Sequence, residues 1–399
     1  MSISPSDWSA CHSAQRRECR DGDTLKENEH FLPQHYLRQF RIRDSKLIGI
    51  AKVAPFRLIG AGPIRGQCQK QNFYSDSPGA DKLLGTTESD LAPVLTDVVK
   101  REDFNSPQLV ALRLLAVLLH IRTRKAIETA KVFPKYIAYK VIKHGIESGR
   151  LPPPPGGRWT EDMMDFGGVA GSLIEEAVIP CWMEMQTLQL KLLRAPPNEY
   201  FITSDNPVVI LNEFCSRANS QRSFAGFSLT GFELLLPISP NICLFFFDQN
   251  VYKVGRRKSR LVHISADDVE ILNALQIQSA ETCLYFHDLA LECRVADCAT
   301  KYATLRAPIR DSLRHLPGRH EREQLLHIRA PAGRLPRKWA LCKLRRRITA
   351  RIGVRRNIAW SESIKQLMRD LDQNPLGPTE DLLTRHMKVI GTMQTVPVE

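Results

Sequence analysis

The alternation of hydrophobic and polar positions divides the chain into a helical part and a strand-rich part. Between residues 86 and 195, apolar side chains recur three and four positions apart, as Leu112 and Leu115 do, and this spacing predicts amphipathic helices. Between residues 198 and 290, short β-branched and aromatic runs lie between turn residues, which predicts strands. Helices and strands do not alternate regularly, so we expect an α+β fold in which a mixed or antiparallel sheet packs on helices.

The helical part contains three signals for the beginning of a helix. Acidic residues follow Thr87, where they favour the positive end of a helix dipole, so we expect a helix to begin there. Ser106 precedes Pro107, which is the pattern of an N-cap followed by proline in the first helical turn. Pro134 is expected to begin the next helix, and residues 171–193 are expected to form a long amphipathic helix.

The segment 242–247 is the most apolar of the predicted strands. It contains no polar residue, so we expect it in the centre of a sheet with both of its faces covered. The other expected elements are a helix at 33–40, strands at 46–53 and 55–59, a glycine-rich loop at 60–66, strands at 200–203, 208–211, 232–236, 261–264 and 282–286, and a helix at 267–279.

These patterns predict a single α+β domain at 29–300, preceded by a flexible arm at 1–28. A basic extension at 301–360 and a helical or flexible tail at 361–399 are expected to follow. No stretch offers about 20 predominantly apolar residues, so we expect no membrane-spanning helix. The arm is polar and contains acids, unlike secretory or transit segments, and we therefore expect a cytoplasmic protein.

The positive charge is concentrated near the C-terminus. The chain of 399 residues has a formal net charge of +13, and residues 301–360 hold 17 Lys and Arg against three acids. The rest of the chain is therefore nearly neutral. A basic segment beside a neutral body is typical of proteins that contact nucleic acid or another polyanion.

The densest part of this extension, at 337–356, carries an apolar stripe at helical spacing that includes Leu341 and Leu344. We expect a basic amphipathic helix, suited to nucleic-acid phosphates, an anionic membrane surface or an acidic partner. The alternative is a solvated tail that binds nothing specific. The residues predicted to contact a polyanion are Lys343, Arg345, Arg346, Arg347, Arg351, Arg355 and Arg356.

The ten cysteines are scattered along the chain rather than grouped. Several, such as Cys243, lie in apolar runs where a free thiol behaves as a small hydrophobic residue. The closest pair, Cys293 and Cys298, lacks the spacing and the second ligand pair of a zinc site. We therefore expect reduced thiols. The cofactor stays open: a divalent metal is compatible with the sequence, but no motif supports one.

The segment at 30–40 joins polar residues to an apolar helical face, and reads His-Phe-Leu-Pro-Gln-His-Tyr-Leu-Arg-Gln-Phe. His30 and Gln34 flank Pro33, where the helix is expected to begin. A histidine in this position is suited to act as a general base or a metal ligand. The alternative is structural, with His30 bonding backbone groups and anchoring the entry of the chain.

A second polar constellation, Ser204-Asp205-Asn206 before Pro207, follows the predicted strand at 200–203. Asp and Asn bond their own backbone in turns, which explains the segment without a function. A carboxylate and an amide at a strand end are also typical of polar sites. In that interpretation Asp205 positions a metal or a water, and the candidate catalytic residues are His30, Gln34, Asp205 and Asn206.

These motifs occur in an order that resembles a known family. The His-x-x-Pro-Gln-x-Tyr-Leu-x-x-Phe opening at His30, together with segments 72–74, 201–207, 236–241 and 272–280, is similar to the family of domain of unknown function 4238. The resemblance spans about residues 29–290 and leaves the basic extension outside. It implies no activity, because that family is uncharacterised.

Two functional hypotheses follow from the sequence. The first is a nucleic-acid-associated protein. Its enzymatic form is a hydrolase of nucleic acid or another phosphate ester, in which His30 moves a proton and the basic extension holds the substrate. The alternative is a non-enzymatic scaffold or partner-binding protein whose basic tail binds polyanions. The sequence does not choose between them.

Overall fold

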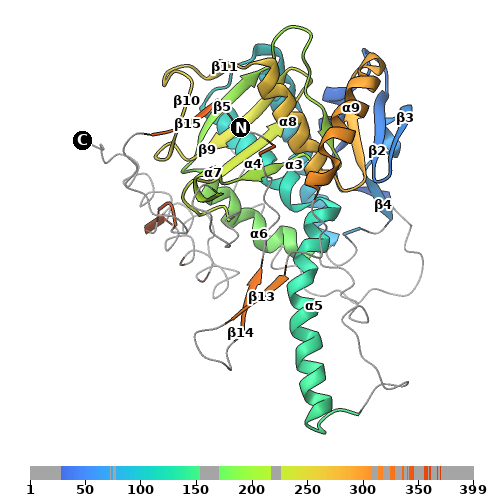
Figure 1. Ribbon diagram of the computed structural model, residues 1–399, viewed down its shortest axis with the longest axis vertical. Coiled ribbons are helices and arrows are strands. Elements are labelled where there is room, and N and C mark those ends of the chain that lie inside the picture. The colour runs from blue at the N-terminus through green and yellow to red at the C-terminus, as the bar shows by residue number, and fades with distance from the viewer. Residues whose placement is uncertain are drawn as a thin grey trace.

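The structure is a computed structural model that describes the body of the chain and parts of the C-terminal extension. The described residues are 28–71, 73–74, 78–152, 170–216, 226–306, 313–317, 324–328, 335–336, 339, 341–345, 355–357, 359–360, 366 and 369. The predicted arm at 1–28 and the predicted tail at 361–399 therefore lie almost entirely outside the described residues. The described part is a mixed α+β fold, as predicted (Figure 1).

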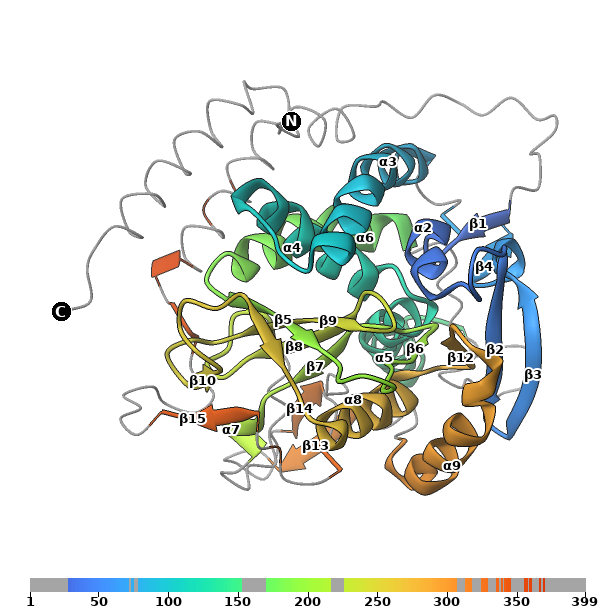
Figure 2. The ribbon, with the colours of Figure 1, turned by 90° about the horizontal axis from the view of Figure 1, so that it is seen from above.

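A five-stranded sheet lies at the centre of the body (Figure 2). In order across the sheet, its strands are β11 (Leu261–His263), β5 (Gln189–Arg194), β9 (Ile242–Phe247), β8 (Glu233–Pro237) and β7 (Val209–Leu211). Neighbouring strands pair antiparallel except β11 and β5, which are parallel. β9 is the middle strand and all of its residues are buried, which confirms the prediction for 242–247.

The two faces of this sheet contribute to separate hydrophobic cores, because successive side chains of a strand point to opposite faces. On one face, Leu244 shares a core with three helices. On the other, Phe245 shares a core with α8 (Ala266–Ser279) and with Trp339, whose ring centroid lies 5.3 Å from that of Phe245. The three helices of the first face are α3 (Pro78–Arg101), α4 (Ser106–Ile121) and α6 (Ala170–Met185).

A second, four-stranded sheet lies beside the first (Figure 2). Its strands are β3 (Phe56–Pro63), β2 (Leu47–Val53), β12 (Cys283–Phe286) and β6 (Thr203–Ser204), all antiparallel. Ile277 of α8 shares a core with Leu284 of β12 and with Val295 of α9 (Glu292–Tyr302). α8 therefore packs against both sheets and joins them.

The segment that opens the described chain folds as predicted. β1 (Asn28–His30) pairs with β4 (Gln69–Gln71), and the predicted helix at 33–40 is α2 (Gln34–Leu37) followed by a 3₁₀ turn at Arg38–Phe40. Tyr36 is fully buried, and its hydroxyl bonds the Thr203 hydroxyl over 2.6 Å. The motif at His30–Phe40 is thereby held against the second sheet.

Several predicted boundaries are wrong. α3 begins at Pro78 rather than at Thr87, and the N-cap of α4 is Asn105 rather than Ser106, because the Asn105 side chain accepts from the backbone of Gln108 and completes a capping box. α5 (Arg124–Glu147) begins after Thr123, runs through Pro134 and projects from the body (Figure 1). Residues 189–193 are in strand β5, where pairing with β9 overrides the helical pattern, and β3 continues through the predicted loop to Pro63.

The C-terminal extension also differs from the prediction. Cys342–Leu344 forms strand β15 rather than part of a helix, because it pairs with β10 (Tyr252–Val254) and buries Cys342 in the core. Residues 346–354 lie outside the described part. The remaining elements are β13 (Leu313–Pro317) and β14 (Gln324–Ile328), which pair antiparallel, and the short helix α7 (Glu213–Ser216).

No single helix in the described residues is long and apolar enough to cross a membrane. Leu84–Arg101 of α3 and α4 meet the length and composition criteria only together, as a pair bent by 114°.

Candidate functional site

A concave pocket of about 690 Å³ lies where α4, β5 and the C-terminal segment meet. It also borders the loops on either side of β10. All charged residues in the described part of the lining are Lys or Arg, and none of the described lining residues is Asp, Glu, His or Cys. The basic lining residues are Arg113, Lys191, Arg257, Lys258, Arg260 and Arg356.

Arg113 of α4 is a partly buried cation at this pocket. Its guanidinium donates to Gln186 Oε1 over 2.7 Å, to Gln186 O over 3.2 Å and to Leu188 O over 3.1 Å. These acceptors are uncharged, and no carboxylate in the described residues pairs with it. Burial lowers the pKa of Arg113 to about 10, so the side chain is still charged at neutral pH. An uncompensated cation in such a position favours an anionic ligand.

Lys191 of β5 fixes the loop between β10 and β11. Its side chain is buried, and Nζ donates to the main-chain oxygens of Arg256 and Arg257 over 3.1 Å each and to that of Ser259. An ammonium group has three protons, so these three carbonyls fill its capacity. We call residues 256–260, Arg-Arg-Lys-Ser-Arg, the basic loop. Its Arg and Lys side chains are exposed, while its backbone is held in place from beneath.

Arg260 places another cation at the rim. Its guanidinium carbon lies 5.1 Å from the centre of the Phe104 ring, and Nη1 also donates to the main-chain oxygen of Phe104. The same nitrogen lies 3.3 Å from Asp103 Oδ1, but both side chains are at least half exposed. An exposed pair of this kind contributes little to stability, so Arg260 remains accessible to another anion.

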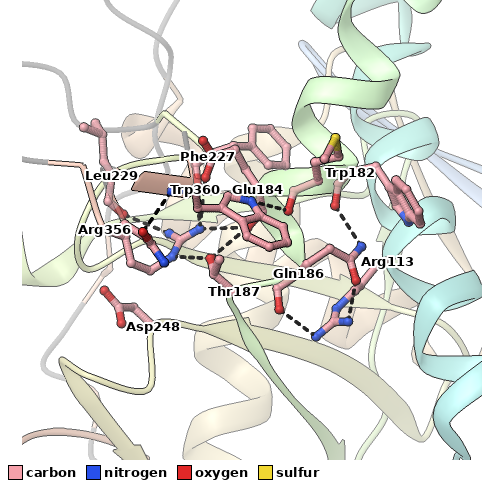
Figure 3. A network of polar contacts seen from close by, with 12 residues as sticks. Arg113, Trp182, Glu184, Gln186, Thr187, Phe227, Leu229, Asp248, Arg356 and Trp360 are labelled. Atoms are coloured by element: carbon pink, nitrogen blue, oxygen red, sulfur yellow. Dashed lines mark hydrogen bonds and ion pairs between the residues drawn. The ribbon is translucent and has the colours of Figure 1, made fainter. Parts of the chain in front are cut away.

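The C-terminal segment forms one wall of the pocket (Figure 3). The Arg356 side chain is 2% exposed and donates to the Thr187 hydroxyl over 2.6 Å. Trp360 is also buried, and its indole nitrogen donates to Met183 O over 3.0 Å. The other acceptors of the Arg356 guanidinium are the main-chain oxygens of Glu184, Phe227 and Leu229.

His30 and Gln34 lie together elsewhere in the fold. The Gln34 amide donates to His30 Nε2 over 3.0 Å, which leaves Nδ1 to donate to Gln67 O over 3.1 Å. The main-chain oxygen of His30 accepts from Arg122 over 2.5 Å. Burial lowers the pKa of His30. Both ring nitrogens are therefore occupied, as the structural interpretation of this motif requires.

Arg122 is the centre of this cluster, and the sequence analysis did not select it. Its side chain is buried and pairs with Glu88, while Nε donates to the Tyr74 hydroxyl over 3.3 Å. Glu88 also lies 3.9 Å from Nδ1 of His35, whose pKa burial lowers to about 4. Arg122 thus ties the His30 motif to α3 and to the end of α4.

Asp205 holds a turn rather than facing a cavity. Oδ1 accepts from the backbone of Glu281 over 2.8 Å, and Oδ2 accepts from Thr282 over 2.7 Å and from Cys283 over 3.0 Å. The residue is buried, and this burial raises the pKa of Asp205 against the opposing effect of those N–H groups and of Lys125. Its oxygens are therefore committed to the start of β12.

Asn206, the next residue, also bonds neighbouring elements through its side chain. Its Oδ1 accepts from the Thr123 hydroxyl over 2.7 Å, and its Nδ2 donates to the Ser279 hydroxyl over 2.7 Å. These bonds join the start of α5 to the end of α8. Within the described residues, no hydrogen bond or ion pair joins Asp205 or Asn206 to His30 or Gln34, and each pair bonds its own set of neighbours.

The family described as "Protein of unknown function (DUF4238)" matches residues 28–144 and 169–289, more than half of the chain. The chain belongs to the DUF4238 family. No curated protein and no solved structure matches it.

The residues predicted to contact a polyanion lie beyond the DUF4238 match. Lys343 is exposed on β15, and Arg345 is exposed with its Nε bonded to Gln249 O, beside the pocket, over 2.6 Å. Arg355 is half-buried in a bridge with Leu229. Arg356 must be corrected, because its donors are used inside the protein. The remaining three, Arg346, Arg347 and Arg351, lie outside the described residues.

Most of the described pocket lining lies within the DUF4238 region, and the sequence analysis selected none of those lining residues. The basic loop directly follows Gly255 and has four Lys or Arg among its five residues. This run of cations is the sequence feature from which this part of the pocket could have been predicted. Arg113 is the one Lys or Arg in the apolar run of α4, which is typical of a buried cation. In the described residues, no group of three or more His, Cys, Asp or Glu is arranged to hold a metal ion.

Proposed function

We propose that this DUF4238 protein binds nucleic acid, with the pocket and the basic loop holding the phosphate backbone. The observation that carries the proposal is the pocket lining, whose described residues include six Lys or Arg and no Asp or Glu. Lys191 and Arg356 contribute only their positive charge, because their donors bond acceptors inside the protein. Like charges in one concavity repel each other, so this arrangement is most stable when an anion enters it. Phosphates are the principal partners of Lys and Arg in nucleic acids.

The basic loop supports a ligand longer than one phosphate. Arg257 and Lys258 are exposed, and no carboxylate in the described residues pairs with either of them. The loop backbone is already fixed by Lys191, so binding costs less conformational entropy than it would in a free loop. Arg345 continues the cationic surface from the pocket toward the C-terminal extension.

The same lining favours binding over hydrolysis. Phosphate-ester hydrolases generally use His, Asp or Glu side chains to move protons or to hold a metal, and the described residues of the pocket lining include none. His30 and Asp205 have their polar atoms engaged by neighbouring groups. We therefore prefer a nucleic-acid-binding protein to a hydrolase. In this proposal the binding surface lies in the body of the protein and not in the C-terminal extension alone.

The test is a charge reversal on the basic loop. The double variant Arg257→Glu, Lys258→Glu is compared with the wild type for binding of a fluorescent single-stranded DNA or RNA of about 20 nucleotides. We expect the affinity to fall by roughly tenfold or more, because each lost cation removes a phosphate contact. The dependence of log affinity on log salt should become shallower by about 1 to 2.

The matched control reverses two cations on another surface. Lys52→Glu with Arg57→Glu changes the net charge equally on the β2–β3 hairpin, where both side chains are exposed. This control should lower the affinity far less. If the two double variants weaken binding equally, the pocket is not the binding site. If the wild type binds no oligonucleotide at low salt, the proposed function is wrong.

A further inference from the structure

The pocket has the size of a small-molecule site rather than of an open groove. Its volume of about 690 Å³ is in the usual range for pockets that enclose a ligand. A nucleotide or two fits such a space, whereas a duplex does not. The rest of a bound strand has to pass over the rim, where the basic loop exposes Arg257 and Lys258.

The cations of the pocket also differ in how far their side chains are buried. Arg113 is partly buried, and its neighbours Gln186 and Leu188 supply uncharged acceptors only. Its Nε has no hydrogen-bond partner. The cations of the basic loop, in contrast, are solvated. A bound anion therefore gains the most binding free energy beside Arg113, where solvent compensates the positive charge least.

Amides provide most of the remaining polar lining. Six of the lining residues are Asn or Gln, which can donate and accept hydrogen bonds at the same time. Such groups suit the mixed donors and acceptors of a base and a sugar, which inorganic phosphate lacks. These residues are Asn105, Gln186, Gln189, Gln249, Asn250 and Asn357.

We infer that the pocket holds the phosphorylated end of a nucleic-acid single strand, with its terminal phosphate beside Arg113 and the following phosphates along the basic loop. This inference rests on the proposed function. A terminal phosphate monoester carries about 1.5 to 2 negative charges at neutral pH. A phosphodiester within the strand carries about one. The terminal group is therefore the better partner for the Arg113 guanidinium, which no carboxylate of the described residues balances.

The test compares one single-stranded oligonucleotide with a 5′-phosphate, with a 3′-phosphate and with two hydroxyl ends. We expect one phosphorylated form to bind the wild type roughly tenfold more tightly than the hydroxyl form, as an additional charge-assisted contact implies. Unlabelled adenosine 5′-monophosphate should compete for the pocket better than adenosine does.

The decisive variant is Gln186→Glu, which places a carboxylate where the Gln186 oxygen now lies 2.7 Å from Arg113. The new ion pair supplies the missing counter-charge, so the preference for the phosphorylated end should disappear. The change also removes the bond from the Gln186 amide to Trp182 O, so folding is checked by thermal unfolding. Gln189→Glu is the matched control: it adds the same charge to the lining, and no described hydrogen bond joins it to Arg113. This control should weaken all oligonucleotides but keep the preference.

The outcomes separate this inference from the proposed function. If phosphorylated and hydroxyl ends bind the wild type equally, and the basic-loop variant weakens both, the strand-end inference is overturned while nucleic-acid binding stands. If Gln189→Glu abolishes the preference as completely as Gln186→Glu does, the phosphate is not held beside Arg113. If no oligonucleotide binds, both proposals fail.

Discussion

The Arg356 guanidinium donates a hydrogen bond of 2.6 Å to the hydroxyl of Thr187, from a segment beyond the DUF4238 match to the turn between α6 and β5 (Figure 3). The remaining donors reach three main-chain oxygens, and the nearest carboxylate oxygen, on Glu184, is 3.9 Å away. Burial lowers the pKa of Arg356. Arg356 therefore fastens the C-terminal segment to the body and closes one side of the pocket.

Replacement of this residue should destabilise the protein. In Arg356→Met, the apolar stem is retained, but the Thr187 hydroxyl and three main-chain oxygens each lose a donor. These are charge-assisted hydrogen bonds from a buried side chain, so we expect the free energy of unfolding to fall by about 2 to 4 kcal/mol. Urea unfolding followed by tryptophan fluorescence measures this change. Lys343→Ala on β15 is the control, because an exposed side chain should contribute less than about 0.5 kcal/mol. Equal effects of the two variants would contradict the role of Arg356 as a fastener.

Replacement of Lys191 should loosen the basic loop. Lys191→Met removes the ammonium that bonds the main-chain oxygens of Arg256, Arg257 and Ser259, while every cation of the loop remains. We expect faster amide hydrogen exchange at 256–260, and a loss of oligonucleotide affinity of several-fold, because the cations are no longer preorganised.

The control for this prediction is Lys253→Met, an exposed cation on the neighbouring strand β10. It changes the charge equally without releasing the loop. Unchanged exchange at 256–260 in Lys191→Met would show that the loop is held by other contacts.

The architecture was largely predictable, because it depends on local patterns. The apolar run at 242–247 required a central strand, and it is one. The errors occurred where pairing between distant segments decides the outcome. Residues 189–193 have a helical pattern, but β9 offers a long apolar partner. Cys342–Leu344 lies in a segment with a helical apolar stripe, but it forms a strand because it pairs with β10. Periodicity within one segment contains no information about such partners.

The candidate site was less predictable, because its residues come from segments far apart in the sequence. Arg113 and Lys191 meet the basic loop only through the packing of α4 and β5. The total charge was misleading here: the body is nearly neutral as a whole, yet several of its cations line one pocket. His30 and Asp205 drew attention because of their residue types, but their hydrogen bonds are those of structural anchors.

Asp205→Asn tests that structural assignment. The carboxylate accepts three backbone N–H groups, and an amide has to turn its NH₂ toward at least one of them. We expect the free energy of unfolding to fall by about 1 to 3 kcal/mol, with oligonucleotide affinity unchanged at temperatures where the variant is folded. Asp90→Asn, an exposed acid on α3, should leave stability nearly unchanged. A variant that keeps its stability but loses hydrolysis of a phosphate ester would restore the hydrolase hypothesis.

Glu233 should make stability depend on pH. It is fully buried on β8, and this burial, with Glu213 nearby, raises its pKa from the usual 4.5 to about 7, against the opposing effect of hydrogen bonds from the Glu213 backbone N–H and from the side chains of Cys342 and Tyr252. Between these two values the folded protein keeps a proton that the unfolded chain releases. The contribution of Glu233 to the free energy of unfolding therefore decreases as pH rises through this window, by about 3 kcal/mol in total.

Glu233→Gln stays uncharged at every pH and keeps an oxygen to accept from the Glu213 backbone, 3.0 Å away. Urea unfolding of the variant and the wild type across the window between pH 4.5 and about 7 should give two curves that diverge. The variant should gain stability relative to the wild type as pH rises, because it has no proton to lose. The ionisation of histidines such as His35 changes the free energy of unfolding of the wild type and of the variant equally. Its contribution therefore cancels in the difference between the two curves. Asp297→Asn, an exposed acid on α9, should give a curve parallel to that of the wild type. Parallel curves for Glu233→Gln would mean that Glu233 is ionised in the folded protein over this whole range.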